Sequence, residues 1–231
     1  MSIYITGDMH GEYGRLVYAN KELDDGDILI ACGDWGYIFA NDKSENSLLD
    51  DIEKKNYSIL FVDGNHENFP AIYSYPEEEW NGGRIHRIRN NIIHLCRGQV
   101  FEIEGLKFFT FGGGYSLDKW RRKENVDWWS QEMPENREFE EGKKNLEKHG
   151  FKVDYIITHT ANIKTLEYLP IALKDTAIKP SVPEEHVLNY YLEDIRERCE
   201  YKKWFFGHFH KDAEIAYTKQ RLLWYDMEKI N

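Results

Sequence analysis

Short apolar runs that end in polar, glycine-bearing loops constrain the fold of this chain most strongly. Three such runs occupy residues 2–6, 27–32 and 58–62, and each is followed within two residues by glycine. Between them, residues 13–23 and 44–55 carry apolar side chains at helical spacing. Strands that alternate with helices predict βαβ units and a largely parallel sheet.

The middle of the chain follows a different pattern. Runs at 92–95, 99–103 and 106–111 follow one another closely, and Glu104-Gly105 between the last two predicts a hairpin turn. This part of the sheet should therefore be antiparallel. Further strands are expected at 155–158 and 203–206, with two closing strands near 214–217 and 221–224.

The remaining segments predict helices and loops. Residues 136–149 form a highly charged helix that we expect to be exposed, and residues 161–182 look irregular. Ser181 precedes a proline and a glutamate, which predicts the capped start of another helix. The acidic runs 77–79 and 138–141 are interpreted as solvated faces. Because there is no repeat or linker, we predict a single domain over residues 1–231.

Composition narrows the class of protein. The 231 residues are 41% hydrophobic and 15% aromatic, which is typical of a globular protein with a substantial core. The net charge of −11 disfavours binding to long nucleic acids and to anionic membranes. No stretch approaches the roughly 20 apolar residues of a membrane span. The absence of a leader pattern, and three widely spaced cysteines interpreted as reduced thiols, favour the cytoplasm. The oligomeric state cannot be predicted.

Side chains that bind metals follow five of the expected strands. In open α/β sheets, ligands gather beyond the carboxyl ends of strands, so residues from different strand ends can meet there. The candidates are Asp8, His10, Asp34, Asn65, His159, His208 and His210.

These seven side chains offer four imidazoles, two carboxylates and one amide oxygen. That number exceeds the needs of one tetrahedral ion and suits two ions bridged by a carboxylate. Because the set contains no thiolate, it indicates catalytic ions with mixed nitrogen and oxygen shells rather than a structural zinc site. We expect two divalent ions, with Mn preferred and Fe, Zn and Ni as alternatives.

The motifs around these residues resemble those of the calcineurin-like metallophosphoesterase superfamily. They are Gly7-Asp8-Met9-His10-Gly11, Gly33-Asp34, Gly64-Asn65-His66-Glu67, Thr158-His159 and Gly207-His208-Phe209-His210. The resemblance implies an α/β fold, a four-layer αββα sandwich of two mixed β-sheets flanked by helices. It also implies hydrolysis of a small phosphate ester by a metal-bridging hydroxide.

The same resemblance implies a role for each residue. Asp8, His10 and His210 would hold the first ion, Asn65, His159 and His208 the second, and Asp34 would bridge them. His66 would act as an acid near the leaving group, as the imidazolium. We expect the variant His66→Ala to keep both ions and lose most turnover.

The chain differs from one branch of the superfamily in the residues that would bind the phosphate group. Protein serine/threonine phosphatases of the superfamily carry an Asp-Arg-Gly sequence shortly after the residue matching Asp34, whereas this chain has Tyr37 there and no arginine. The aspartate of that sequence orients the catalytic histidine, so the partner of His66 is left open.

The stretch from Gly112 to Glu132 resembles a bacterial and phage-associated subgroup, in which Arg122 would bind phosphate. The alternative is a surface arginine paired with Glu124 or Asp127. The Trp128-Trp129 pair is expected to pack as a lid, with stacking on a base or sugar as the alternative.

Two other functions remain open. The fold can serve as a non-catalytic protein-interaction scaffold, although retention of all seven ligands and His66 disfavours that. A nuclease or a nucleic-acid end-processing phosphatase would keep the chemistry, but the acidic charge makes nucleic acid an unlikely partner. The histidines outside the motifs, His86, His94, His149 and His186, are interpreted as surface or hydrogen-bonded structural residues, and Cys32 as a core residue.

Overall fold

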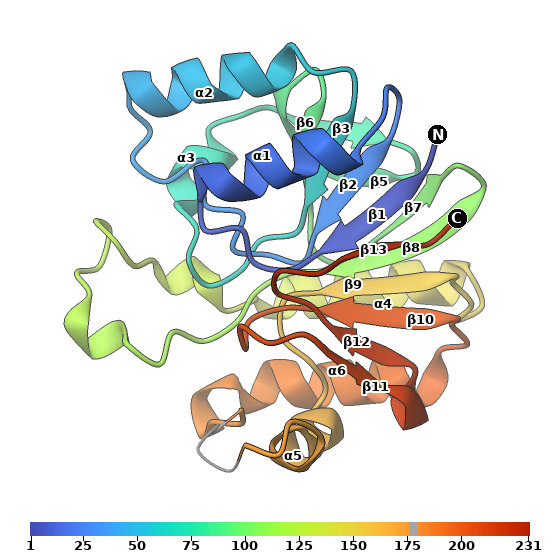
Figure 1. Ribbon diagram of the computed structural model, residues 1–231. Coiled ribbons are helices and arrows are strands. Elements are labelled where there is room, and N and C mark those ends of the chain that lie inside the picture. The colour runs from blue at the N-terminus through green and yellow to red at the C-terminus, as the bar shows by residue number, and fades with distance from the viewer. Residues whose placement is uncertain (176–179) are drawn as a thin grey trace.

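The computed structural model describes residues 1–175 and 180–231, and its strands form two mixed β-sheets (Figure 1). The first sheet contains β1 (Ile3–Thr6), β2 (Ile28–Ala31), β3 (Ser58–Phe61), β4 (Glu77–Trp80), β5 (Gly83–Arg89), β6 (Ile92–Leu95) and β13 (Met227–Lys229). The second contains β7 (Gln99–Ile103), β8 (Leu106–Phe111), β9 (Tyr155–Thr158), β10 (Lys203–Phe206), β11 (Ala213–Ile215) and β12 (Gln220–Leu222).

The strand order gives each sheet a parallel centre. The seven-stranded sheet has the order β13-β1-β2-β3-β6-β5-β4, and β1, β2, β3 and β6 are parallel neighbours. The six-stranded sheet has the order β11-β12-β10-β9-β8-β7, and β12, β10, β9 and β8 are parallel. The antiparallel strands lie at the edges. The antiparallel pairing expected for the middle of the chain is found for β7 with β8, whereas β6 lies in the other sheet, parallel to β3 and antiparallel to β5.

Helices cover the outer face of each sheet. The helices α1 (Tyr13–Glu22), α2 (Lys43–Glu53) and α3 (Phe69–Tyr73) pack on the seven-stranded sheet, and α4 (Asn136–Lys148), α5 (Ile163–Ala172) and α6 (His186–Arg198) pack on the other (Figure 1). Short 3₁₀ helices occupy Lys119–Arg121, Ser130–Glu132, Pro183–Glu185 and Ala216–Thr218. The four-layer αββα sandwich is therefore confirmed.

Alternation along the strands explains the layers. In β2, Ile28 and Ile30 face the second sheet, whereas Leu29 and Ala31 face the helices. The inner layer between the sheets also contains Phe101, Phe108 and Phe205 of the second sheet. Because successive side chains of a strand point to opposite faces, a strand covered on both sides must be apolar throughout, and β2 is fully buried.

The predicted hairpin is confirmed at Glu104-Gly105. Both residues have positive φ, 52° and 74°, and Ile103 pairs with Leu106 across the turn. A two-residue turn with positive φ at both positions matches the twist of the flanking strands.

One sequence prediction was incomplete and another was wrong, because tertiary structure overrides local pattern. Residues 77–79 were interpreted as a solvated face, and Glu77 and Glu79 are exposed as expected, but the segment also forms the edge strand β4, in which Glu77 makes an ion pair with Arg84 of β5 at 2.6 Å. Edge strands tolerate charged residues because one side of them faces water. The segment 161–182 was expected to be irregular, but α5 lies within it and contains Pro170; residues 176–179 of that segment lie outside the described residues.

Three smaller differences concern the later elements. Helix α4 is not wholly exposed, because Gly142 and Leu146 are buried on its inner face. Ser181 does not cap a helix, and its hydroxyl contacts the ring of His186 at 3.0 Å instead. The two closing strands are shorter than expected, and β13 follows them as an unexpected edge strand beside β1.

Candidate metal centre

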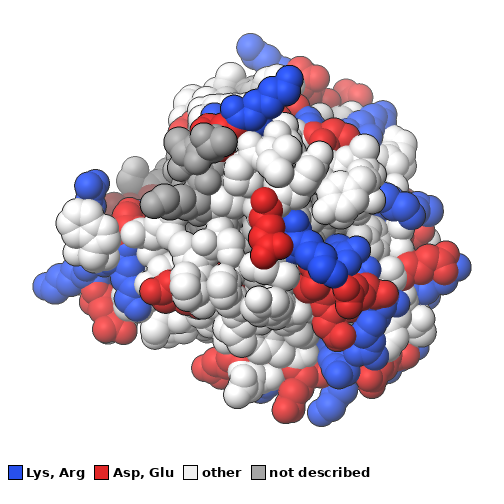
Figure 2. All heavy atoms as spheres, turned by 90° about the horizontal axis from the view of Figure 1, so that it is seen from below, with Lys and Arg blue, Asp and Glu red and all other residues white. Residues whose placement is uncertain are grey.

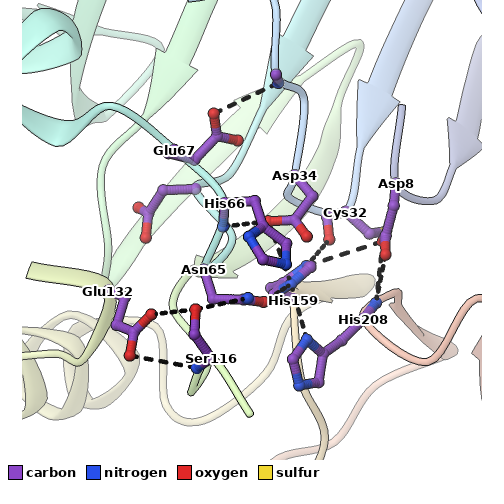
Figure 3. A network of polar contacts seen from close by, with 12 residues as sticks. Asp8, Cys32, Asp34, Asn65, His66, Glu67, Ser116, Glu132, His159 and His208 are labelled. Atoms are coloured by element: carbon purple, nitrogen blue, oxygen red, sulfur yellow. Dashed lines mark hydrogen bonds and ion pairs between the residues drawn. The ribbon is translucent and has the colours of Figure 1, made fainter. Parts of the chain in front are cut away.

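Five parallel strands of the two sheets deliver the predicted ligands to one place. Asp8 and His10 follow β1, Asp34 follows β2 and Asn65 follows β3. His159 follows β9, and the pair His208 and His210 follows β10. Figure 3 shows the side chains of Asp8, Asp34, Asn65, His159 and His208 pointing toward one another. The structure thus brings all seven predicted ligands together.

The first group consists of Asp8, His10 and His210. The Nε2 atoms of His10 and His210 lie 2.8 Å apart, and Nε2 of His210 lies 3.1 Å from Oδ2 of Asp8. Asp8 is buried and also accepts the backbone N–H of His208 at 2.9 Å. Together with Asp34, these donor atoms all lie within 4.8 Å of one another, a spacing that one ion can span.

The second group consists of Asn65, His159 and His208. Nε2 of His159 lies 2.9 Å from Oδ1 of Asn65 and 3.1 Å from Nδ1 of His208. Nδ1 of His159 lies 2.8 Å from the carbonyl oxygen of Cys32. Since a carbonyl only accepts hydrogen bonds, Nδ1 of His159 carries the proton. The lone pair of its Nε2 therefore faces the other two candidate metal-ligand atoms, Oδ1 of Asn65 and Nδ1 of His208.

Asp34 lies between the two groups. Its Oδ1 is 3.5 Å from Nε2 of His159, and its Oδ2 is 3.8 Å from Nε2 of His10. Burial alone would raise the pKa of this carboxyl, but the imidazoles of His159, His66 and His10 together lower it below its ordinary value. Asp34 is therefore an anion with one oxygen facing each group.

This donor set fits divalent metal ions. The facing ring nitrogens need a hydrogen or a metal ion between them, because two imidazole lone pairs at hydrogen-bond distance repel each other. Two buried carboxylates supply the negative charge that offsets such ions.

The backbone at four of the ligands is left-handed. His10, Asp34, His208 and His210 have φ values of 48°, 46°, 73° and 48°. Residues with a Cβ rarely adopt this region, and they persist there only where the surrounding structure holds them. Such outliers are concentrated at functional sites in proteins, and here they aim the side chains inward.

Two glycines allow the loops to approach this closely. A Cβ on Gly64 would overlap the carboxylate and backbone nitrogen of Asp34, and a Cβ on Gly207 would overlap the carboxylate of Asp8. Any other residue at these positions would displace a carboxylate from the site.

His66 lies at the rim of the centre. Its backbone N–H donates to Oδ1 of Asp34 at 2.7 Å, and its ring centroid lies 5.7 Å from that of His10. Together with His10, His210 and Arg122, it lines a surface cavity of about 550 Å³. Burial lowers the pKa of His66, Asp34 opposes this and Arg122 adds to it, so these surroundings favour the neutral ring. The imidazolium expected from sequence therefore needs an added anion nearby.

Arg122 pairs with neither of the two carboxylates considered from sequence. It forms a two-pronged ion pair with Asp118, from Nε to Oδ1 at 2.9 Å and from Nη2 to Oδ2 at 2.8 Å. Its Nη1 donates to the backbone carbonyl of Asp127 at 3.1 Å. Asp118 also raises the pKa of His66 and lines a neighbouring cavity with it, which makes it a candidate for the partner that sequence left open.

Asn65 is held by a chain of buried polar groups, to which no such role was assigned from sequence. Its Nδ2 donates to Oγ of Ser116 at 3.0 Å, and that hydroxyl donates to Glu132 at 2.5 Å (Figure 3). Since Nδ2 is fixed as a donor, Oδ1 of Asn65 is left to face His159. The Gly-Gly-x-x-Ser pattern was the only sequence signal for this contact.

Trp128 and Trp129 are buried, and the ring of Trp129 contacts that of Phe39 edge-on at 5.7 Å. They therefore pack against the protein, as the first of the two interpretations predicted, and are not free to stack on a base or sugar. Cys32 is fully buried, which confirms its interpretation as a core residue.

Comparison with known proteins agrees with this geometry. A family model described as calcineurin-like phosphoesterase matches residues 1–212. The chain belongs to the calcineurin-like phosphoesterase family. Membership supports metal-dependent phosphoester hydrolysis, and the matched range includes both groups, Asp34 and His66. No curated protein compared with the chain matches it. Among its described residues, this family member has no helix long and apolar enough to cross a membrane.

Proposed function

We propose that this protein hydrolyses a small phosphate ester with two divalent ions. In this proposal Asp8, His10 and His210 hold the first ion. Asn65, His159 and His208 hold the second, and Asp34 bridges them. The observation that carries it is the position of Asp34, whose two oxygens each face a different set of nitrogen donors.

The ions would supply the nucleophile by lowering the pKa of a shared water, and would offset charge on the phosphate. The protein's own residues do the rest. Asp34 and Asp8 fix the charge of the site, and the Cys32 carbonyl fixes the tautomer of His159. His66 lines the cavity beside both groups, and an oxyanion bound there would raise the pKa of its ring and favour the proton that it donates to the leaving oxygen.

Manganese is the ion that we propose first. The set of four imidazoles, two carboxylates and one amide contains no thiolate, and such mixed shells suit Mn, with Fe, Zn or Ni able to bind the same donors.

A small substrate fits the charge of the molecule better than a nucleic acid does. On the face shown in Figure 2, basic and acidic side chains are intermixed and no broad basic surface is seen. The net charge of −11 repels a phosphate backbone at long range. The cavity beside His66, at about 550 Å³, has room for a single phosphate ester.

His66→Ala tests the proposal together with a matrix of metals and substrates. Mono- and diesters of p-nitrophenol are assayed with Mn, Fe, Zn, Ni and Mg. We expect turnover to need added metal and to fall roughly 10²–10⁴-fold in His66→Ala, because general acid catalysis is lost. Metal content, measured by elemental analysis, should stay at the wild-type value. His149→Ala, at the end of α4, is the matched control and should retain activity.

Two outcomes would contradict the proposal. Loss of metal from His66→Ala with unchanged residual turnover would make His66 a ligand instead of an acid. Absence of both metal binding and turnover in the wild-type chain would favour the scaffold alternative.

A further inference from the structure

A second group of metal-binding side chains lies on the hairpin formed by β5 and β6. His86 and His94 are directly opposite each other in the antiparallel register, and Cys96 lies two residues beyond His94 on the same face. All three are buried, with exposed fractions of 8%, 1% and 7%. Polar side chains opposite each other in a sheet are close enough to share a ligand.

The distances match those of a tetrahedral zinc site. The Nδ1 atoms of His86 and His94 lie 3.1 Å apart, and Sγ of Cys96 lies 3.6 Å from Nδ1 of His86. The three donor atoms all lie within 4.8 Å of one another. With Zn–N bonds of about 2.0–2.1 Å and a Zn–S bond of about 2.3 Å, tetrahedral angles separate two nitrogens by about 3.3 Å and nitrogen from sulfur by about 3.6 Å.

A carboxylate orients one of the histidines. Nε2 of His94 lies 3.1 Å from Oδ1 of Asp63, and Arg97 donates to Oδ2 of the same carboxylate at 2.8 and 2.5 Å. Since the carboxylate paired with Arg97 only accepts, Nε2 of His94 carries the proton and Nδ1 presents its lone pair to His86 and Cys96. Metal-binding histidines in proteins are held by carboxylates in this way.

There is room for a fourth ligand. The three side chains line a cavity of about 350 Å³ together with Tyr73, Glu77 and Arg84. The ring of Tyr73 covers His86 at a centroid distance of 5.2 Å. A water or a small anion can complete four-fold coordination from the cavity side.

We propose that His86, His94 and Cys96 form a second metal site, which binds one zinc-class ion through two Nδ1 atoms and a thiolate. Binding replaces the S–H bond of Cys96 with a sulfur–metal bond, and the proton leaves to solvent. The site is distinct from the phosphoesterase centre, whose seven proposed ligands include no sulfur. Soft thiolate selects zinc over manganese, so the two sites should load with different metals.

Cobalt serves as the spectroscopic probe. The full-length protein, loaded with Co²⁺, should show thiolate-to-cobalt charge-transfer absorption in the near ultraviolet. Cys96→Ser should abolish this absorption and lower bound zinc by one ion per chain. Cys199→Ser, at a cysteine that belongs to neither site, should leave both unchanged. The hydrolysis of p-nitrophenyl phosphate by the Mn-loaded chain should be the same in all three proteins.

X-ray absorption on the zinc-loaded wild-type chain keeps the test decisive if a variant fails to fold. The proposal expects a sulfur neighbour of zinc at about 2.3 Å. A zinc shell of nitrogen and oxygen alone, together with no charge-transfer absorption, would overturn it and leave His86 and His94 as a hydrogen-bonded pair in which His86 donates to His94.

Discussion

Arg122 has its guanidinium fixed before any substrate arrives. Asp118 holds two of its nitrogens and the Asp127 carbonyl a third, while the side chain still lines the cavity beside His66. An arginine pre-oriented by a carboxylate loses little conformational entropy when it binds an anion. At the scale of the residue, it is the best-placed described cation for binding phosphate at this cavity.

Replacing Arg122 with alanine should weaken catalysis without disturbing the metals. A charge-assisted hydrogen bond contributes about 1.5–3 kcal/mol, so kcat/KM should fall roughly 10- to 100-fold. Steady-state kinetics on a monoester measure the change, and metal content should not alter. Arg121→Ala is the matched control, since Arg121 packs over the exposed ring of Trp120 instead. Equal losses in both variants would show that the effect is not specific to Arg122.

At the scale of the element, the position of each proposed metal ligand depends on where the preceding strand ends. In the loop that follows β3, Gly64 lies so close to Asp34 that only a hydrogen atom, and no Cβ, fits between them. The position of the Asp34 carboxylate, the proposed bridging ligand, therefore depends on the loop that contains Gly64.

Gly64→Ala should remove metal binding while the fold survives. The added methyl overlaps the Asp34 carboxylate, so the carboxylate must move away from at least one group. We expect bound metal to fall below half of the wild-type content and phosphoesterase turnover to be lost, as measured by elemental analysis and by hydrolysis of p-nitrophenyl phosphate. Gly14→Ala, in helix α1, where an added Cβ meets nothing within 4 Å and the backbone is helical, is the control for replacing a glycine by alanine. Wild-type metal content in Gly64→Ala would contradict this view of the loop.

Sequence predicted the parts of the fold in which local pattern and tertiary structure agree. Short apolar runs predict buried strands, and they correctly indicated the apolar strands of both sheets. The same runs located the strand ends that carry Asp8, Asp34 and His159. The charged strand β4 could not be found this way, because its stability comes from pairing with β5. The contact of Asn65 with Ser116 joins residues 51 positions apart, and no local pattern reports such a distance.

At the scale of the whole molecule, the negative net charge favours a small substrate over an extended polyanion. The chain carries 41 acidic and 30 basic residues, so an extended polyanion meets repulsion except where Arg122 or the proposed metal ions act locally. A compact phosphate ester carries fewer charges and meets less of this repulsion.

The rate of hydrolysis of a small phosphate ester should therefore depend only weakly on the salt concentration. Between 50 and 200 mM NaCl we expect kcat/KM for p-nitrophenyl phosphate to change by less than about 3-fold, because few ions are released when one phosphate binds. The same series with a short single-stranded oligonucleotide is the comparison. Fast cleavage of the oligonucleotide with a steep decline in salt would favour the nuclease alternative.

The left-handed backbone at His10, Asp34, His208 and His210 has a consequence for how the centre meets its ions. The folded scaffold bears the conformational cost of these four residues, so an arriving ion finds the donors already in place. Under the proposed ligand assignment, exchange of one metal ion for another would require no rearrangement of the loops. If the proposed centre forms, the choice of ion would then rest on the donor types and on the supply of ions, and not on a change in loop conformation.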